Sequence, residues 1–219
     1  MKHVLFTGGG SAGHVTPNLA LMERLTRAGW GVSYIGSYRG IERSLVEAAG
    51  VPYTSIATGK LRRYWSPKNL IDPFLIVWGC FQALIICRRR CPDVVFSKGG
   101  FVAVPVVIAA WLCRIPVVCH ESDVTPGLAT RLCAPIANVV CINFEETAHF
   151  VNPRKILLTG TPLRRALTDG DRARGLAWLG FSPELPVLLV FCGSLGAARI
   201  NDVVRQSLPC LLYTSDAAD

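Results

Sequence analysis

A glycine-rich turn joins a short apolar strand to a helix within the first seventeen residues. Residues 4–7 read Val-Leu-Phe-Thr, residues 8–13 read Gly-Gly-Gly-Ser-Ala-Gly, and His14 follows directly. A turn of small residues lets backbone N–H groups approach an anion, and the positive end of a helix dipole lies beside them. Thr16 and Pro17 suit the start of that helix. This stretch therefore predicts a phosphate or diphosphate site around which the chain is arranged.

The alternation of strand and helix continues for most of the chain. Further strands are predicted at 31–35, 51–56, 93–97, 116–120, 138–142 and 155–159, with helices between most of them. This pattern predicts an α/β fold, a Rossmann-like doubly wound parallel sheet of seven strands with its ligand at the carboxyl ends. At 219 residues the chain has room for one such domain and part of another.

A second strand, glycine turn and helix begin near the end of the chain. We expect an N-terminal domain at 1–163, a linker at 164–186, and the first βα unit of a truncated second Rossmann-like domain at 187–209, with its strand at 187–191. Residues 210–219 continue neither a helix nor a strand pattern. We interpret them as a foreign tail.

Composition predicts a reducing compartment. The chain has nine cysteines, an odd number, without a Cys-x-x-Cys pair. The N-terminus shows no signal peptide, because Lys2 and His3 lead straight into a strand. Free thiols packed in a core are the expected state, and no metal site is predicted.

The formal net charge of +8 is concentrated in one segment, because residues 60–91 hold seven cations and one anion. The apolar run at 73–87 within it is shorter than the roughly 20 residues that span a bilayer. A buried crossover helix and a helix on an anionic membrane surface are both open, and the two can coexist. The aromatic residues among the cations favour a membrane over nucleic acid. The membrane interpretation rests on Arg62, Arg63, Trp65, Phe74, Trp78, Phe81, Arg88, Arg89 and Arg90.

Gly8, Gly10 and Gly13 also fit the G-x-G-x-x-G pattern of dinucleotide sites. An NAD site further needs a carboxylate at the end of the second strand to bind the ribose. That strand ends at Ser37, and no carboxylate precedes Glu42. The sequence therefore disfavours a dehydrogenase, and no cofactor is expected.

Three titratable residues follow strands at the predicted edge. His14 suits proton abstraction near neutral pH, or it only hydrogen-bonds the loop backbone. Glu121 and Asp123 are either a base or hydroxyl-binding pair, or they brace the loop and cap the next helix. The residues alone leave these alternatives open.

Five motifs, taken in order, resemble those of the MurG family, the peptidoglycan N-acetylglucosaminyltransferases that make lipid II. The motifs are Gly-Gly-Ser-Ala-Gly-His at 9–14, Ser-Lys-Gly-Gly-Phe at 97–101, His-Glu-Ser-Asp at 120–123, Gly-Thr-Pro-Leu-Arg at 160–164 and Gly-Ser-Leu-Gly-Ala at 193–197. The resemblance covers residues 1 to about 209. It implies a two-domain GT-B glycosyltransferase, peripheral on the cytoplasmic face of the bacterial plasma membrane.

The implied reaction transfers GlcNAc from UDP-GlcNAc to the C4 hydroxyl of MurNAc in undecaprenyl-diphosphoryl-MurNAc-pentapeptide, with inversion and without a metal. The resemblance makes His14 the candidate base. It also implies that both glycine turns, the second comprising Gly99, Gly100 and Phe101, face the acceptor diphosphate. The residues implied at the donor–acceptor cleft are Ser11, Ala12, Gly13, Asp123, Arg164, Ser194 and Asn201.

Two departures from that family matter. Many members carry Asn where Asp123 stands, and an ionised carboxylate accepts hydrogen bonds but cannot donate them. Most of the domain that grips UDP is also missing, so we expect the chain alone to be inactive. Two alternatives stay open: a non-catalytic membrane-associated binder of polyprenyl diphosphates, and a related transferase with a diacylglycerol acceptor.

Overall fold

The computed structural model describes residues 1–59, 72–191 and 197–216. The chain divides into two compact units, Met1–Asp169 and Gly170–Asp219, and the division falls within the expected linker. Four residues of the sequence-based site predictions, Arg62, Arg63, Trp65 and Ser194, lie outside the described residues.

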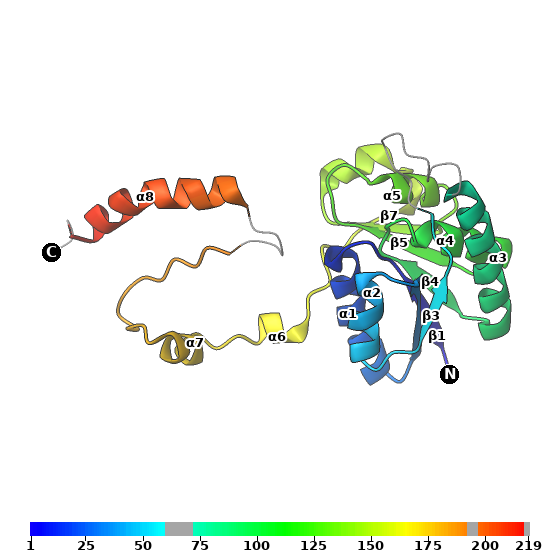
Figure 1. The fold of residues 1–219 in the computed structure, drawn as a ribbon, viewed down its shortest axis with the longest axis horizontal. Helices are drawn as coiled ribbons and strands as arrows, with labels where there is room; N and C mark the ends of the chain where they lie inside the picture. Colours follow the sequence, from blue (N-terminus) through cyan, green and yellow to red (C-terminus); the bar gives the residue numbers. More distant parts are fainter. Residues whose placement is uncertain (60–71, 192–196, 217–219) are drawn as a thin grey trace. The chain divides into compact units, whose positions relative to one another are not determined.

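The first unit is built on a parallel sheet of seven strands, as the sequence predicts (Figure 1). Its spatial order is β3-β2-β1-β4-β5-β6-β7. The chain order reverses between β1 and β4, so a crevice is expected at the carboxyl ends of these two strands. The strands are β1 (His3–Thr7), β2 (Gly31–Ser37), β3 (Tyr53–Ile56), β4 (Val94–Ser97), β5 (Val117–Glu121), β6 (Val139–Ile142) and β7 (Ile156–Leu158).

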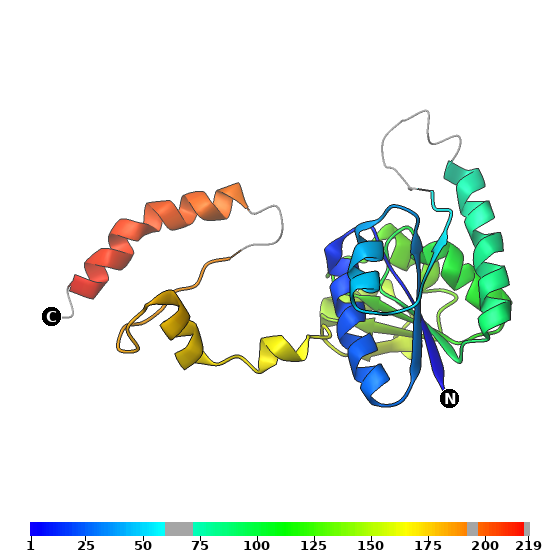
Figure 2. The same ribbon diagram turned by 60° about the horizontal axis from the view of Figure 1, so that its bottom comes forward.

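Helices cover both faces of this sheet (Figure 2). Buried side chains of α1 and α2 form a core with one face, around Phe6 and Tyr34. Those of α3, α4 and α5 form a second core with the other face, around Leu5 and Val95. The helices are α1 (Ala12–Arg27), α2 (Ile41–Ala48), α3 (Asp72–Arg90), α4 (Ala103–Leu112), α5 (Leu128–Cys133) and α6 (Arg165–Thr168), with short 3-10 turns at Glu145–Phe150 and Pro153–Lys155.

The first helix starts earlier than the sequence predicts. Ser11 is its N-cap, whereas Thr16 and Pro17 lie inside it. Proline has no N–H to donate to the carbonyl oxygen of Gly13, four residues earlier, yet the helix continues through it. The capping prediction was therefore wrong, and the glycine turn passes directly into the helix.

The second unit differs from the sequence-based expectation at two places. Residues 187–191 form no strand, and Leu189 and Phe191 are 72% and 82% exposed. A strand needs a neighbouring backbone to pair with, and the described part of this unit holds only α7 (Arg172–Leu179) and α8 (Ala198–Asp216) as regular elements. The helical pattern also continues through residues 210–216, where we expected it to stop.

No helix among the described residues has both the length and the apolar character needed to cross a bilayer. The longest apolar helix of the first unit, α3, instead packs along α4 with one face and leaves the other exposed.

Candidate functional site

Two glycine turns meet at the carboxyl ends of β1 and β4. Gly10 has a φ of +90°, and a β-carbon there would lie 2.8 Å from the ring of Phe101. Gly100 has a φ of +82°, and a β-carbon there would overlap the carbonyl oxygen of Gly9. Side chains are therefore excluded where the turns touch. The predicted glycine turns are brought together at the crevice.

Two buried polar side chains hold the first glycine turn by hydrogen bonds. The Tyr34 hydroxyl donates a hydrogen bond of 2.8 Å to the carbonyl oxygen of Gly8. Asn18 Nδ2 donates to the carbonyl oxygen of Thr7 and to the Tyr34 hydroxyl, at 3.2 Å each. Both side chains are fully buried, and burial raises the pKa of Tyr34 well above its ordinary value. The turn is thus held by neutral donors whose geometry is fixed by β2 and α1.

Glu42 holds the same turn from the side of α2. Its carboxylate is fully buried and accepts hydrogen bonds from the Ser37 N–H at 3.1 Å and the Ser37 hydroxyl at 2.5 Å. The Gly10 N–H also donates to this carboxylate, at a longer distance of 3.4 Å. The carboxylate folds back over Gly40 and against Gly9, so a side chain at either position would collide with it.

After the second strand, the sequence has no carboxylate for an NAD ribose before Glu42. In the structure, Glu42 does lie near the end of β2, but its oxygens are occupied by Ser37 and Gly10 and closed off from solvent. The carboxylate therefore braces the loop, and its position is unsuited to binding ribose hydroxyls.

His14 lies beside the first glycine turn and belongs to the first helical turn of α1. Its Nδ1 lies 3.0 Å from the carbonyl oxygen of Gly9 and 3.1 Å from Ser11 Oγ. Because a carbonyl oxygen only accepts, Nδ1 carries the proton in the neutral ring. Nε2 is then the basic nitrogen, and within the described residues it has no hydrogen-bond partner. Bracing the loop and accepting a proton are compatible in this one side chain.

Glu121 braces its own loop. Its Oε1 accepts hydrogen bonds from the N–H groups of Ser122 and Asp123, at 2.8 and 3.1 Å, and its Oε2 accepts from the Gly127 N–H at 3.2 Å. These contacts favour the bracing alternative for Glu121, whose side chain is buried. The Asp123 residue is exposed, and its backbone carbonyl accepts from Thr147 Oγ1.

His120 ties this loop to the segment after β7. Its Nε2 donates to the carbonyl oxygen of Gly160 at 2.9 Å, and burial lowers its pKa. Asn143 Nδ2 donates to Thr161 Oγ1 and, at 3.4 Å, to the carbonyl oxygen of Ser122. The Gly160–Thr161 start of the fourth motif is thereby fixed to the same edge of the sheet.

Lys98 belongs to the Ser-Lys-Gly-Gly-Phe motif and was not among the predicted site residues. It directly follows β4 and is 2% exposed. Its Nζ donates a hydrogen bond of 2.5 Å to Ser122 Oγ, and its β-carbon packs against Gly8. A lysine between a predicted strand and the glycine pair that follows it is the sequence signal that identifies it.

Other predicted site residues lie elsewhere. Arg164 lines a cavity of about 420 Å³ beside the second half of α1, with Met22 and Val51. Asn201 lies on α8, in the second unit. Within the described residues no cluster of His, Cys, Asp or Glu side chains is suited to hold a metal ion.

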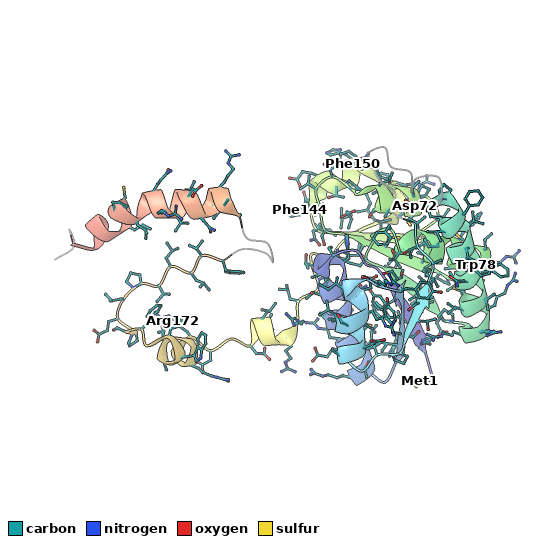
Figure 3. All side chains as sticks on the ribbon, in the orientation of Figure 1. Met1, Asp72, Trp78, Phe144, Phe150 and Arg172 are labelled. Atoms are coloured by element: carbon teal, nitrogen blue, oxygen red, sulfur yellow. The ribbon has the colours of Figure 1, made fainter. Side chains whose placement is uncertain are left out.

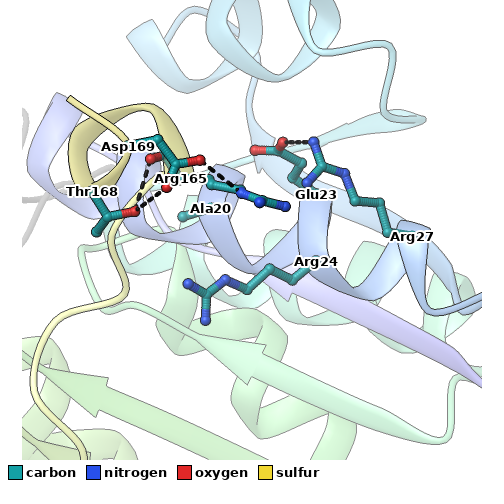
Figure 4. Close-up of a pocket in the computed structure, with 7 residues that line it drawn as sticks. All are labelled: Ala20, Glu23, Arg24, Arg27, Arg165, Thr168 and Asp169. Carbon is teal, nitrogen blue, oxygen red and sulfur yellow. Dashed lines mark hydrogen bonds and ion pairs between the residues drawn. The ribbon is translucent and has the colours of Figure 1, made fainter. Parts of the chain in front are cut away.

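A further cavity, of about 330 Å³, lies between α1 and α6 (Figure 4). Arg27 pairs with Glu23 and Arg165 pairs with Asp169 in its wall. The cavity borders the second half of α1, whereas the glycine turns adjoin the helix start. Its arginine charges are largely offset, and it is separate from the candidate site.

The outer face of α3 is apolar and exposed. Its cavity of about 520 Å³ is lined by Pro73, Phe74, Val77, Trp78 and Phe81. The rings of Trp78 and Phe81 stack at 5.6 Å, and the sticks in Figure 3 show Trp78 pointing away from the sheet. Arg88 and Arg89 are exposed at the helix end. Arg90 differs from the membrane interpretation, because it is half-buried and donates to Thr54 Oγ1 at 2.6 Å.

Comparison with known proteins gives a consistent result. Residues 4–142 match the glycosyltransferase family 28 N-terminal domain. A Bacillus cereus protein named UDP-N-acetylglucosamine--N-acetylmuramyl-(pentapeptide) pyrophosphoryl-undecaprenol N-acetylglucosamine transferase 2 is 53% identical over 212 residues, which are 97% of this chain and 60% of that protein. A Lachnoclostridium phytofermentans protein has the same name without the final 2. It is also 53% identical over 212 residues, which are 97% of this chain and 60% of that protein. The chain thus spans 60% of the length of these relatives.

Solved structures show the same fold. The crystal structure of Acinetobacter baumannii MurG superposes with a TM-score of 0.63 at 28% identity, covering 77% of this chain and 48% of that one. The co-structure of Staphylococcus aureus MnaA with UDP superposes with a TM-score of 0.56 at 12% identity, covering 74% and 44%, and supports the fold alone.

Proposed function

Because the chain belongs to glycosyltransferase family 28, we propose that it forms the acceptor side of an inverting N-acetylglucosaminyltransferase. The donor is UDP-GlcNAc, and the acceptor is the C4 hydroxyl of MurNAc in undecaprenyl-diphosphoryl-MurNAc-pentapeptide. The observation that carries this proposal is the contact between the two glycine turns, with His14 beside them. The 53% identity to the Bacillus cereus transferase supports the choice of reaction.

In the proposed mechanism the glycine turns receive the acceptor diphosphate. The Gly9–Gly100 contact leaves backbone without side chains in the crevice, and the start of α1 adds the positive end of its dipole. His14 Nε2 takes the proton from the MurNAc C4 hydroxyl as its oxygen attacks the anomeric carbon. The bond from that carbon to the UDP oxygen breaks, and UDP leaves with the bonding electrons.

The domain roles follow from this assignment. Residues 1–163 are the acceptor domain, 164–186 the linker and 187–209 the start of the UDP-GlcNAc domain, to which Ser194 and Asn201 belong. In this proposal Ser11, Ala12, Gly13 and Asp123 belong to the donor–acceptor cleft, whereas Arg164 lies beside the second half of α1. Residues 210–219 have no role in the reaction. No metal or cofactor takes part.

We infer a peripheral position on the cytoplasmic face of the plasma membrane, and the outer face of α3 supports the contact with a membrane. Phe74 and Val77 are 76% and 69% exposed, and Arg88 and Arg89 follow at the helix end. Apolar side chains inserted among lipid headgroups, with cations beside anionic lipid, are the chemistry of an interfacial helix. The lipid-linked acceptor is then reached from the membrane surface.

A chimera tests the proposed reaction. Residues 1–209 of this chain replace the matching part of the Bacillus cereus relative, and UDP release is measured with the lipid-linked muramyl acceptor. We expect turnover, and we expect His14→Gln to lower kcat about 100-fold or more with a small change in KM. His149→Gln, an exchange of an exposed histidine, is the matched control.

The same assay separates the alternatives. Turnover with diacylglycerol but not with the muramyl acceptor would replace the acceptor assignment. Acceptor binding by the chimera without any turnover would favour the non-catalytic binder. Undiminished turnover of the His14→Gln chimera would remove His14 as the base.

A further inference from the structure

Lys98 places a buried positive charge between the glycine turns and the His-Glu-Ser-Asp loop. The residue is 2% exposed, and its only hydrogen bond from Nζ within the described residues goes to Ser122 Oγ, at 2.5 Å. An ammonium group has three N–H donors. Two of them are therefore unused by the described part of the chain, although burying a charge without partners is costly.

Two carboxylates lie near this ammonium, but they are not equivalent. Burial lowers the pKa of Lys98, and the charges of Glu121 and Asp123 oppose that shift. Glu121 is already engaged by three backbone N–H groups. Asp123 is the exposed one, and it is held next to Ser122, the residue that Lys98 binds. Lys98 forms no direct ion pair in the described chain, so it acts on Asp123 through its field and through the loop.

The carboxylate of Asp123 is unfavourable beside an anionic substrate, because like charges repel. A fixed cation behind the loop offsets that repulsion. Lys98 follows β4 and Asp123 follows β5, and these two strands are neighbours in the sheet. Lys98 and Asp123 are thus linked through Ser122, which Lys98 binds and which directly precedes Asp123.

We propose that Lys98 is a positioning residue that anchors Ser122 and compensates the charge of Asp123, so that the loop at 120–123 admits a substrate carrying a diphosphate. This inference rests on the proposed function for the identity of that substrate. The coupling between Lys98 and Asp123 is a property of the chain itself and is testable without it.

A double-mutant cycle on the 219-residue chain tests the coupling. K98M keeps an unbranched apolar side chain, and D123N keeps the shape of the acid. We expect D123N to lower Tm by about 3 °C when Lys98 is present, because the buried ammonium loses a compensating charge, and by less than about 1 °C in the K98M background. Equal Tm shifts in both backgrounds would overturn the coupling. K155M is the matched control, since Lys155 donates to the Pro135 carbonyl at an exposed site.

Binding measurements test the consequence for the substrate. The probe is a MurNAc-pentapeptide diphosphate with a short polyprenyl chain, compared with the same glycopeptide lacking phosphate. We expect K98M to raise Kd for the diphosphate about tenfold, equivalent to about 1.4 kcal/mol, and D123N to recover most of this loss in the double variant. The Kd for the phosphate-free glycopeptide should change little.

The possible results lead to different conclusions. An equal loss for both probes, or a double variant as weak as K98M alone, would overturn the compensating role. If the unmodified chain binds neither probe, the proposed acceptor fails, and the Tm cycle alone decides whether Lys98 and Asp123 are coupled.

Discussion

Gly100 packs directly against the carbonyl oxygen of Gly9, so the two glycine turns are in backbone contact. The contact joins the end of β1 to the end of β4, the neighbouring strands between which the chain order reverses. A side chain at Gly100 would push the two turns apart, whereas a side chain at Gly9 would collide with the Glu42 carboxylate.

The first prediction concerns that contact. Gly100→Ala should lower the free energy of unfolding by about 2–3 kcal/mol, because the methyl group overlaps Gly9 and the residue has a φ of +82°. Gly127→Ala is the control, since its φ is −63° and no atom lies within 4 Å of the added carbon. We expect a change below about 0.5 kcal/mol there. Urea unfolding followed by circular dichroism measures both, and equal losses would contradict the proposed packing.

The second prediction concerns the buried carboxylate of Glu42. Glu42→Gln leaves one oxygen for the Ser37 N–H and hydroxyl but turns an NH₂ group toward the Gly10 N–H, so the free energy of unfolding should fall by about 2–3 kcal/mol. Glu47→Gln on the same helix removes only an exposed pair with Arg43 and should cost less than about 0.5 kcal/mol. Chemical denaturation compares the two. A Gln variant as stable as the parent would show that Glu42 does not brace the turn.

The third prediction follows from the lowered pKa of His120. A histidine whose pKa is lower folded than unfolded binds fewer protons in the folded state, so stability is level above about pH 6.5 and falls as the pH drops below it. His120→Gln keeps a donor for the Gly160 carbonyl oxygen, and it should reduce the loss of folding stability between about pH 7 and 5. His3, whose pKa is also lowered, should leave a residual slope. Unfolding curves across this range measure the effect, and an undiminished fall in the His120→Gln variant would contradict it.

The sheet and the meeting point of the glycine turns could be predicted because their signals are local. Each strand is a short apolar run that ends at a turn, and parallel strands bring those turns to one edge. The start of α1 was misjudged for an equally local reason, because Thr16 and Pro17 have the residue types of a helix start but lie inside the helix.

The contacts that brace the site could not be read from the sequence. Glu42 reaches Gly10 across 32 residues, and Lys98 reaches Ser122 across 24, so no sequence period marks either pair. The strand expected at 187–191 is absent even though its local sequence signal is strong. Its apolar pattern is clear, but a strand forms only against a neighbour, and the described part of the second unit offers none.

The last prediction concerns the outer face of α3. Trp78→Ser combined with Phe81→Ser removes two stacked, half-exposed rings, and it should lower binding of the chain to vesicles with anionic lipid about tenfold or more. Arg88→Gln with Arg89→Gln should weaken binding by about 1 kcal/mol per cation and reduce its sensitivity to salt. Trp178→Ser is the control, because Trp178 is 85% exposed in the second unit. Vesicle flotation measures all three. If the Trp178 variant loses as much binding as the α3 variant, adhesion is a general property of exposed aromatic residues and the specific role of α3 fails.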